Sequence, residues 1–256
     1  MKSKLGLVLS AGSAKGLAHI GVLKSLQKHN INIDVITGTS MGSLVGGLYA
    51  AGIPLDVIEG LALNMTQRTW VDIGVPRKGF IRGEKILHIL RMLTKNCHIE
   101  ETETPFGCIA ANLNLGTSVS FCEGNLAEAI RASISIPGVF DPWELDDKIL
   151  VDGALVDRLP TTLCVNLGAE RVISVDVSTQ ITETSINSIF DVIVQSMNIM
   201  QSELLKAKHE ESDILIRPDV GDISPNQFQK AEEAIKAGEE ATEKFIPAIK
   251  NLYEEC

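Results

Sequence analysis

One stretch of the chain combines a hydroxyl nucleophile with a backbone that could expose it. Residues 35–51 read VITGTSMGSLVGGLYAA, which predicts a strand end, a tight turn and a helix of small residues. G-x-S-x-G between a strand and a helix is the nucleophile-elbow pattern, in which a strained turn projects the serine hydroxyl. Gly38 and Gly42 stand where a Cβ would strike the strand or the helix. The pattern therefore predicts Ser40 as a nucleophile at a helix start, where free N–H groups favour negative charge.

A serine hydroxyl is a weak nucleophile, so the chain must also supply a base. A histidine base implies an α/β-hydrolase triad, in which the histidine follows the acid along the chain. Only His209 follows the candidate acids, and it falls within a predicted long amphipathic helix. His19 is nearer to the serine in sequence, yet it lies one turn inside a predicted helix. The remaining histidines fall in polar helical or loop contexts: His29, His88 and His98.

A carboxylate could instead take the serine proton directly, and Asp152 is the best candidate. It ends an apolar strand and precedes Gly153, which lets another chain segment approach closely. The same residue could simply cap a turn. Asp176 lies inside a strand pattern, and the pair at 146–147 reads as a hairpin turn. An aspartate with a pKa near ~3.9 is a poor base at neutral pH, so burial would have to raise that pKa.

A loop of small residues, SAGSAKG at positions 10–16, separates the first predicted strand from the first helix. Loop N–H groups at a helix start suit an anion. The spacing of Gly12 and Gly16 fits neither a P-loop nor a dinucleotide fingerprint. The loop could hold one negative oxygen, as an oxyanion hole does, or it could be a turn without a ligand. Lys15 is unusual in the second case, because a cation at a helix N-terminus opposes the helix dipole.

Strands and helices alternate along the chain, which predicts an α/β protein with a mainly parallel sheet covered on both faces. Residues 66–82 show no clear period, and we expect a long loop that serves as a lid or pocket wall. Residues 133–140 read as an apolar loop. The predicted strands cover residues 5–9, 33–36, 106–113, 118–122, 148–151, 171–177 and 214–216. The predicted helices cover residues 16–28, 41–52, 54–64, 84–93, 125–131, 160–167, 187–210 and 226–253.

The composition narrows the possible partners. The chain of 256 residues is 45% apolar and carries a net charge of −10, which argues against nucleic acid and against electrostatic docking on anionic lipid. A lipid substrate would have to be drawn by an apolar surface. Five cysteines without C-x-x-C spacing indicate a reducing compartment and no structural zinc. The apolar run at 5–9 is too short for a signal peptide. We therefore predict a cytoplasmic protein that requires no metal or other cofactor.

Three motifs, in this order, resemble those of the patatin-like phospholipases. They are AGSAKG at 11–16 with the following LAHIGVLKSL, the GTSMG elbow at 38–42, and DGA at 152–154. The segment ASISIPGVF at 132–140 is similar to the stretch that precedes the family's aspartate motif. The likeness covers about residues 5–180, and three motifs in order are far more specific than any one.

This resemblance implies a patatin-like, three-layer α/β/α fold and an acyl hydrolase with a Ser–Asp dyad. By that likeness Ser40 is the nucleophile and Asp152 the base, and the oxyanion hole is formed by the backbone N–H groups of Gly12, Ser13 and Ala14. The chain departs from the family in this first loop, where Ala11 and Ser13 replace two glycines. If either position needs a positive φ, the loop is strained or shifted.

The sequence favours a serine esterase that acts on fatty-acyl esters, with phospholipid or lysophospholipid as the leading substrates. We expect transient contact with a membrane surface. A non-enzymatic lipid- or partner-binding protein on the same fold stays open, supported by the altered first loop. A triad hydrolase that uses His209 and an acyltransferase also stay open. We expect a single domain over residues 1–256, with the motifs within 5–180 and a helical C-terminal part over 186–256.

Overall fold

The computed structural model provides the fold and the side-chain contacts of most of the chain. Most of the loop predicted over residues 66–82 lies outside the described residues, and so does His209. The structure describes residues 3–64, 72, 78–178, 186, 189–205 and 212–254.

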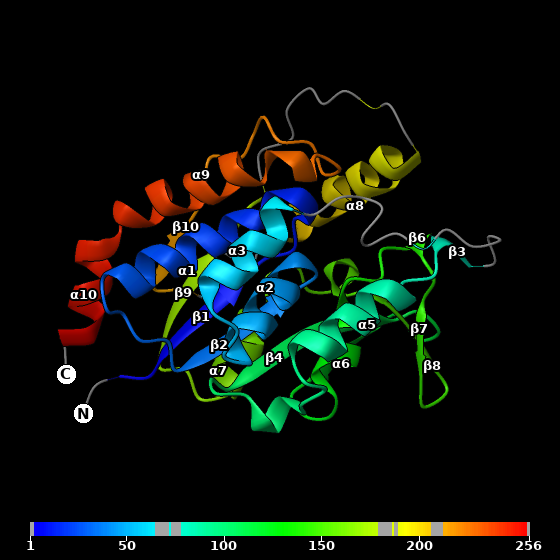
Figure 1. Ribbon diagram of the computed structural model, residues 1–256, viewed down its shortest axis with the longest axis horizontal. Helices are drawn as coiled ribbons and strands as arrows, with labels where there is room; N and C mark the ends of the chain where they lie inside the picture. The colour runs from blue at the N-terminus through cyan, green and yellow to red at the C-terminus, as the bar shows by residue number, and fades with distance from the viewer. Residues whose placement is uncertain are drawn as a thin grey trace.

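Within the described residues, eight strands form one sheet through the centre of the molecule (Figure 1). They are β1 (Leu5–Leu9), β2 (Val35–Thr39), β4 (Phe106–Asn112), β5 (Thr117–Phe121), β7 (Trp143–Leu145), β8 (Lys148–Asp152), β9 (Arg171–Val175) and β10 (Ile214–Ile216). Their order is β10-β9-β1-β2-β4-β8-β7, with β5 also paired to β4. Pairings from β10 to β4 are parallel, whereas β5, β7 and β8 pair antiparallel. The predicted mainly parallel sheet is confirmed.

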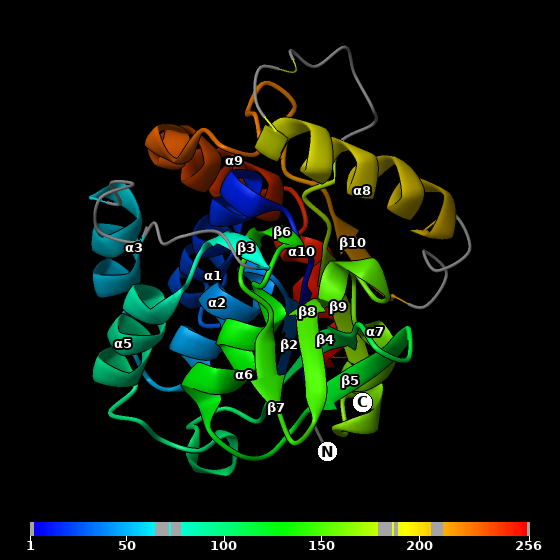
Figure 2. The same cartoon turned by 90° about the vertical axis from the view of Figure 1, so that its right-hand side faces the viewer.

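Helices cover both faces of the sheet, with α7 on the opposite side of the strands from α1, α2 and α6 (Figure 2). The helices are α1 (Ala18–Lys28), α2 (Met41–Ala50), α3 (Leu55–Leu63), α5 (Glu84–Leu93), α6 (Leu126–Ser133), α7 (Thr161–Asn166), α8 (Ile189–Leu205), α9 (Ala231–Glu243) and α10 (Ile246–Glu254). The 3-10 turn η1 (Ser13–Leu17) precedes α1, and η3 (Gly153–Leu155) follows β8. The predicted three-layer α/β/α architecture is therefore confirmed.

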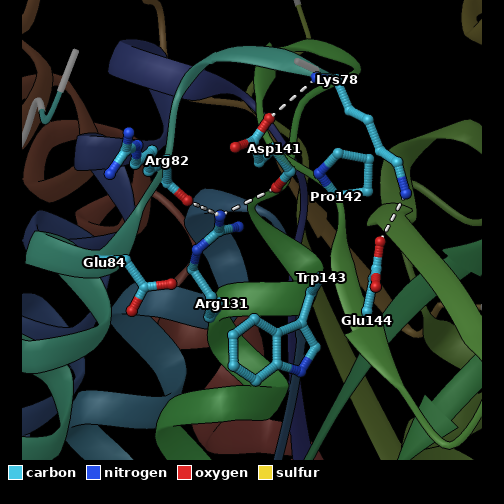
Figure 3. A pocket seen from close by; sticks show the side chains of 8 residues that line it. All are labelled: Lys78, Arg82, Glu84, Arg131, Asp141, Pro142, Trp143 and Glu144. Atoms are coloured by element: carbon cyan, nitrogen blue, oxygen red, sulfur yellow. Dashed lines mark hydrogen bonds and ion pairs between the residues drawn. The ribbon is translucent and has the colours of Figure 1, made fainter. Parts of the chain in front are cut away.

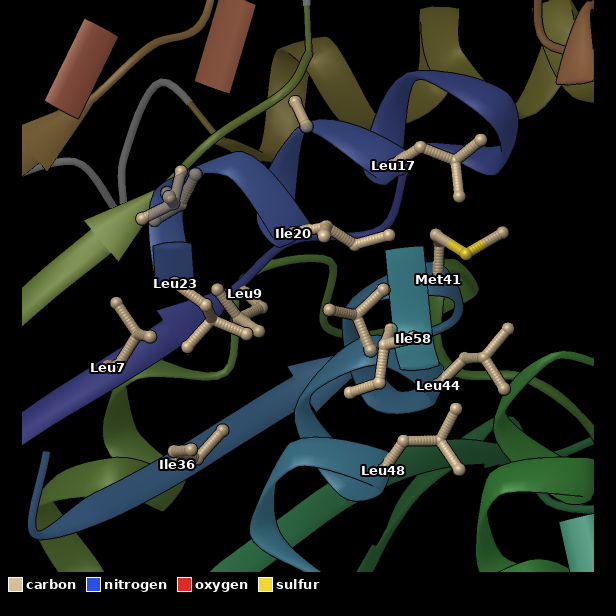
Figure 4. Packing of buried hydrophobic residues seen from close by; sticks show 14 of the residues in the cluster. Leu7, Leu9, Leu17, Ile20, Leu23, Ile36, Met41, Leu44, Leu48 and Ile58 are labelled. Carbon is tan, nitrogen blue, oxygen red and sulfur yellow. The ribbon is translucent and has the colours of Figure 1, made fainter. Parts of the chain in front are cut away.

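The central strand β1 supplies the core on both faces because its side chains alternate. Leu7 and Leu9 join the large cluster under α1 and α2, which also contains Ile20, Leu23 and Leu44 (Figure 4). Val8 joins a smaller cluster under α7. A strand that is apolar on both faces is typical of a covered parallel sheet.

Helix α9, in the C-terminal part of the chain, lies directly against α1. A Cβ on Gly21 would lie 1.9 Å from the carbonyl oxygen of Ile235, and a Cβ on Gly238 would lie 2.0 Å from that of Ala18. Each helix therefore has a glycine where the other helix's backbone passes. This contact joins the helical C-terminal part of the chain to the helix that follows the first loop.

Several predicted boundaries are wrong: the strand predicted over 33–36 is Val35–Thr39, and strand β7 was not predicted. The expected apolar loop over 133–140 contains strand β6 (Gly138–Phe140), which pairs in parallel with β3 (Gly79–Ile81). Strands of three residues are too short to show a sequence period. The helix predicted over 226–253 is divided between α9 and α10, because Pro247 inside a continuous helix would clash with the carbonyl of Glu243. The first helix starts as the 3-10 turn η1.

Candidate active site

Ser40 lies between strand β2 and helix α2, and its backbone is strained. Its φ of 54° and ψ of −120° are uncommon for a residue with a side chain. Such outliers cost about 1–3 kcal/mol and cluster at functional sites. Two glycines permit the turn, since a Cβ on Gly38 would lie 2.4 Å from the carbonyl carbon of Gly42. A Cβ on Gly42 would lie 2.1 Å from the carbonyl oxygen of Leu9.

The sheet brings Asp152 to Ser40 through a shared neighbour strand. Strand β2 pairs along β4 as far as Thr39, which lies opposite Ile109. Strand β8 runs the other way and ends at Asp152, which lies opposite Ala110, the next residue of β4. The two strand ends therefore face each other, and Ser40 Oγ donates a hydrogen bond of 2.6 Å to Asp152 Oδ2.

Asp152 is held by hydrogen bonds on both sides of its carboxylate. Its Oδ1 accepts from the N–H of Ala154 at 2.8 Å, and its own N–H donates to the carbonyl of Ser135 at 2.8 Å. The residue is 1% exposed. Burial raises the pKa of Asp152 to about 6, against the opposing hydrogen bonds from Ser40 and Ala154 and the charge of Arg158. A buried aspartate with this pKa is a competent base near neutral pH.

Two further serines, which the sequence analysis did not single out, fix the backbone of Ser40. The Ser133 hydroxyl accepts the Ser40 N–H at 2.9 Å. The Ser43 hydroxyl donates to the Ser40 carbonyl at 2.6 Å. Both polar groups of the strained residue are therefore satisfied by side chains. Ser43 lies three residues past the nucleophile on α2, a spacing that sequence alone could have indicated, whereas Ser133 comes from the end of α6.

The first loop packs against the start of α2, since a Cβ on Gly16 would lie 2.5 Å from Cγ of Met41. Ser13 has a positive φ of 49°, so one of the two replaced glycines does stand at a left-handed position. The N–H of Ala14 donates to the carbonyl of Pro225 at 3.2 Å. Within the described residues, the N–H groups of Gly12 and Ser13 have no protein acceptor. Two of the three predicted oxyanion donors are thus available.

The other predicted candidates lie elsewhere. His19 is buried, its Nε2 lies 2.8 Å from the carbonyl oxygen of Ser10, and burial lowers its pKa to about 4. Asp176 accepts a hydrogen bond from the N–H of Ser178. The residues at 146–147 form the predicted turn between β7 and β8, with positive φ at both positions. Burial and the charge of Arg158 lower the pKa of Lys15. Of the candidate acids, the structure brings Asp152 to Ser40.

A separate surface cavity of about 840 Å³ lies beside α6, and Arg131 is its most buried charged residue (Figure 3). The Arg131 guanidinium donates to the carbonyls of Gly83, Arg82 and Asp141, which joins α6 to the chain before α5 and after β6. Lys78 in the same cavity is paired with Glu144 at 2.6 Å. The charges of Arg131, Lys78 and Glu144 are therefore engaged in contacts within the protein. The cavity is lined by Lys78, Arg82, Glu84, Arg131, Asp141, Pro142, Trp143 and Glu144.

Among the residues that the structure describes, no three His, Cys, Asp or Glu side chains gather in a way that could hold a metal ion. None of the described helices combines the length and the apolar character that crossing a membrane requires.

A strained serine between strand and helix, with an aspartate against its hydroxyl, defines an α/β protein with a nucleophile elbow. The family model for patatin-like phospholipases matches residues 7–165. The chain belongs to this family, as its three motifs predict.

Two relatives by sequence both carry NTE in their names. An uncharacterized NTE family protein of Mycobacterium tuberculosis is 40% identical over 178 residues, which cover 68% of this chain and 49% of that protein. A protein named lysophospholipase NTE1 of Mycosarcoma maydis is 35% identical over 179 residues, which cover 68% of this chain and 10% of that protein. The chain thus spans about half the length of the mycobacterial relative.

Solved structures with the same fold are more distant in sequence. VipD of Legionella pneumophila superposes with a TM-score of 0.56 at 14% identity, over 97% of this chain and 67% of that one. ExoU of Pseudomonas aeruginosa, in complex with SpcU, gives a TM-score of 0.50 at 14% identity, over 94% of this chain and 52% of that one. At these identities the likeness shows the fold alone.

Proposed function

We propose that the protein is a serine acyl hydrolase that cleaves fatty-acyl esters, with phospholipid or lysophospholipid as substrate. The observation that carries this proposal is the 2.6 Å hydrogen bond from Ser40 Oγ to the buried carboxylate of Asp152. Membership of the patatin-like phospholipase family and the lysophospholipase name of fungal relatives support the substrate class.

In the proposed reaction Asp152 takes the hydroxyl proton as Ser40 Oγ attacks the ester carbonyl carbon. The oxygen of the tetrahedral intermediate is stabilised by the N–H groups of Gly12 and Ser13, each worth roughly 100- to 1000-fold in rate. The protonated Asp152 then gives its proton to the departing alkoxide, which leaves an acyl-enzyme. Water, activated by Asp152, attacks the acyl carbon and releases the fatty acid and free Ser40.

The surroundings of the dyad suit an acyl chain. A cluster of buried apolar side chains includes one residue of the first loop, Ala11, and the residue that holds the Asp152 carboxylate, Ala154. Helix α8 contributes Val194 and Met197 to the same cluster. An acyl chain entering between these elements would exchange water for apolar contacts, at about 25 cal/mol per Å² buried.

We also propose that the outer face of α8 meets the lipid surface. Four large apolar side chains of this helix are exposed: Ile189, Val192, Ile199 and Met200. The hydroxyl of Ser196, which is also exposed, donates to the carbonyl of Val192. The described exposed residues of α8 therefore include no charged side chain, which suits a neutral lipid surface better than an anionic one.

The first experiment compares the wild type with Ser40→Ala and Asp152→Asn, using a fluorophosphonate probe and p-nitrophenyl ester turnover. We expect labelling and turnover in the wild type and loss of turnover in both variants. Absence of labelling and turnover in the folded wild type would favour a non-enzymatic lipid-binding protein. His209→Ala separates the dyad from the triad, because the dyad predicts little loss of activity and the triad predicts near-complete loss.

Lipid contact is tested with phosphatidylcholine vesicles. The double variant Val192→Glu, Ile199→Glu should bind vesicles at least about tenfold more weakly, since it places two carboxylates in the proposed contact face. The matched control Leu115→Glu, Val165→Glu adds the same charge at two exposed apolar positions outside α8. If both double variants bind vesicles equally, the outer face of α8 is not the surface that contacts lipid. Turnover of a soluble ester should stay unchanged in both.

A further inference from the structure

Arg158 connects three parts of the molecule around the proposed dyad. It lies six residues after Asp152, is 7% exposed, and was not singled out from the sequence. Its Nη2 donates to the carbonyl of Ala11 at 2.8 Å, and its own carbonyl accepts the N–H of Ala11 at 3.1 Å. Its Nη1 donates to Asn198 Oδ1 at 2.9 Å and to Gln201 Oε1 at 2.8 Å. Both backbone polar groups of Ala11 are therefore bound by this one residue.

The acceptors of these guanidinium hydrogen bonds are neutral oxygens. A buried cation without a carboxylate in hydrogen-bond contact is costly, so the charge is retained against a desolvation penalty. Burial lowers the pKa of Arg158, and the nearby charges of Asp176 and Asp152 oppose this shift. Lys15 and His19 are also near: burial lowers the pKa of each, and the charge of Arg158 adds to that lowering. Asp176 Oδ2 also lies 3.9 Å from Arg217 Nε. Asp152 is thus one of two buried carboxylates in the field of this guanidinium.

We propose that Arg158 is a positioning residue for the acyl-transfer reaction. It fixes Ala11, so that the next two residues present their N–H groups to the oxyanion, and its charge favours the ionised form of Asp152. The inference rests on the proposed hydrolase function. Through Asn198 and Gln201 it also ties α8 to the first loop, so the helix that borders the apolar cluster is fixed to the same residue.

Ala11 is the residue through which a loss of Arg158 would act on catalysis. Gly12 and Ser13 follow it directly, and Ser13 already occupies a left-handed conformation. A loop with one strained residue relaxes when its anchor is removed, and a misplacement of about 1 Å can cost ~100-fold in rate. A purely structural arginine would alter stability and leave the pH dependence of turnover unchanged.

The test uses Arg158→Gln and Arg158→Lys with a soluble p-nitrophenyl ester across pH 4–9. Arg158→Gln removes the charge, so we expect kcat to fall about 10- to 100-fold, KM to change less, and the acid limb of kcat/KM to move to higher pH. Arg158→Lys keeps the charge but not the forked hydrogen bonds, so kcat should fall while the acid limb stays at the wild-type position. Asn198→Ala is the matched control, because it removes one partner on α8 and leaves the Ala11 contacts in place.

Wild-type kcat and an unmoved acid limb in folded Arg158→Gln would overturn the proposal. If Arg158→Gln does not fold, Arg158→Lys tests the proposal instead. Wild-type kcat in that variant would show that the guanidinium hydrogen bonds of Arg158 do not position the loop. Circular dichroism and thermal unfolding establish folding in each case. A wild-type protein without turnover or probe labelling would refute the hydrolase itself, which separates failure of the function from failure of this inference.

Discussion

The two halves of the proposed dyad are built in different ways. The turn that holds Ser40 is formed mainly by its neighbours in sequence, since Gly38 and Gly42 permit the turn and Ser43 binds the Ser40 carbonyl, with one hydrogen bond from the Ser40 N–H to the distant Ser133. Asp152 is placed by distant segments, through pairing of β8 with β4 and a hydrogen bond to Ser135. The nucleophile is therefore a local feature of the chain and the base a tertiary one. Substitutions should act on the two halves through different physical causes.

The largest effect is expected on the nucleophile side, from Gly42→Ala. The new Cβ would meet the carbonyl oxygen of Leu9 at 2.1 Å, and backbone cannot move aside as a flexible side chain can. We expect a loss of at least about 3 kcal/mol of stability, or failure to fold. Gly60→Ala is the control, because that helical position has no atom within 4 Å, and it should gain up to about 1 kcal/mol. Urea unfolding measures both, and equal stability of the two variants would contradict a tight elbow.

On the base side, Asp152→Asn should raise stability at neutral pH. The folded pKa of about 6 lies above the unfolded value of about 3.8. The unfolded chain therefore releases this proton at lower pH than the folded protein, and stability falls as pH rises from about 4 to 6. Each pKa unit is worth about 1.4 kcal/mol, so the buried charge costs a few kcal/mol above pH 6.

The measurement compares urea unfolding of the wild type and Asp152→Asn at pH 8 and at pH 3. The variant should be more stable at pH 8, and the difference should nearly vanish at pH 3, below the unfolded pKa of 3.8, where the wild-type carboxyl is largely protonated in both states. A constant difference across this range would mean that burial does not raise this pKa. Turnover of the wild type should fall below about pH 6 for the same reason, since the protonated carboxyl cannot act as a base.

The strain at the nucleophile predicts a smaller effect. Glycine adopts the φ of 54° found at Ser40 without a Cβ clash. Ser40→Gly should therefore be about 1–2 kcal/mol more stable than Ser40→Ala, although both lack the hydroxyl. Thermal unfolding of these two inactive variants measures how much the backbone strain at residue 40 lowers stability. If alanine proves as stable as glycine here, the turn carries no strain.

The same contrast explains what the sequence could predict. The elbow and the first loop are contiguous motifs, and Leu5–Leu9 shows the continuous apolar run of a buried strand, so their places along the chain could be recognised. The residues alone favoured Asp152 as the base but left Asp176 open, and the resemblance assigned the role to Asp152. Ser133 contacts Ser40 from α6, and Arg158 contacts the first loop from beyond η3; no local period or spacing encodes such contacts. The strand β6 was missed because three residues are too few to show alternation.

The first loop combines a local sequence motif with tertiary anchoring, and Ser13→Gly tests it with the smallest expected effect. The motif is local, yet both backbone polar groups of its residue Ala11 are bound by the distant Arg158. Ser13 has a φ of 49°, whereas Ala11 has no positive φ and is buried. Ser13→Gly should gain about 0.5–1 kcal/mol by relieving the left-handed strain, and Ala11→Gly should lose a similar amount. Thermal unfolding compares them, and a loss in both variants would show that the serine, like the alanine, is preferred at its position.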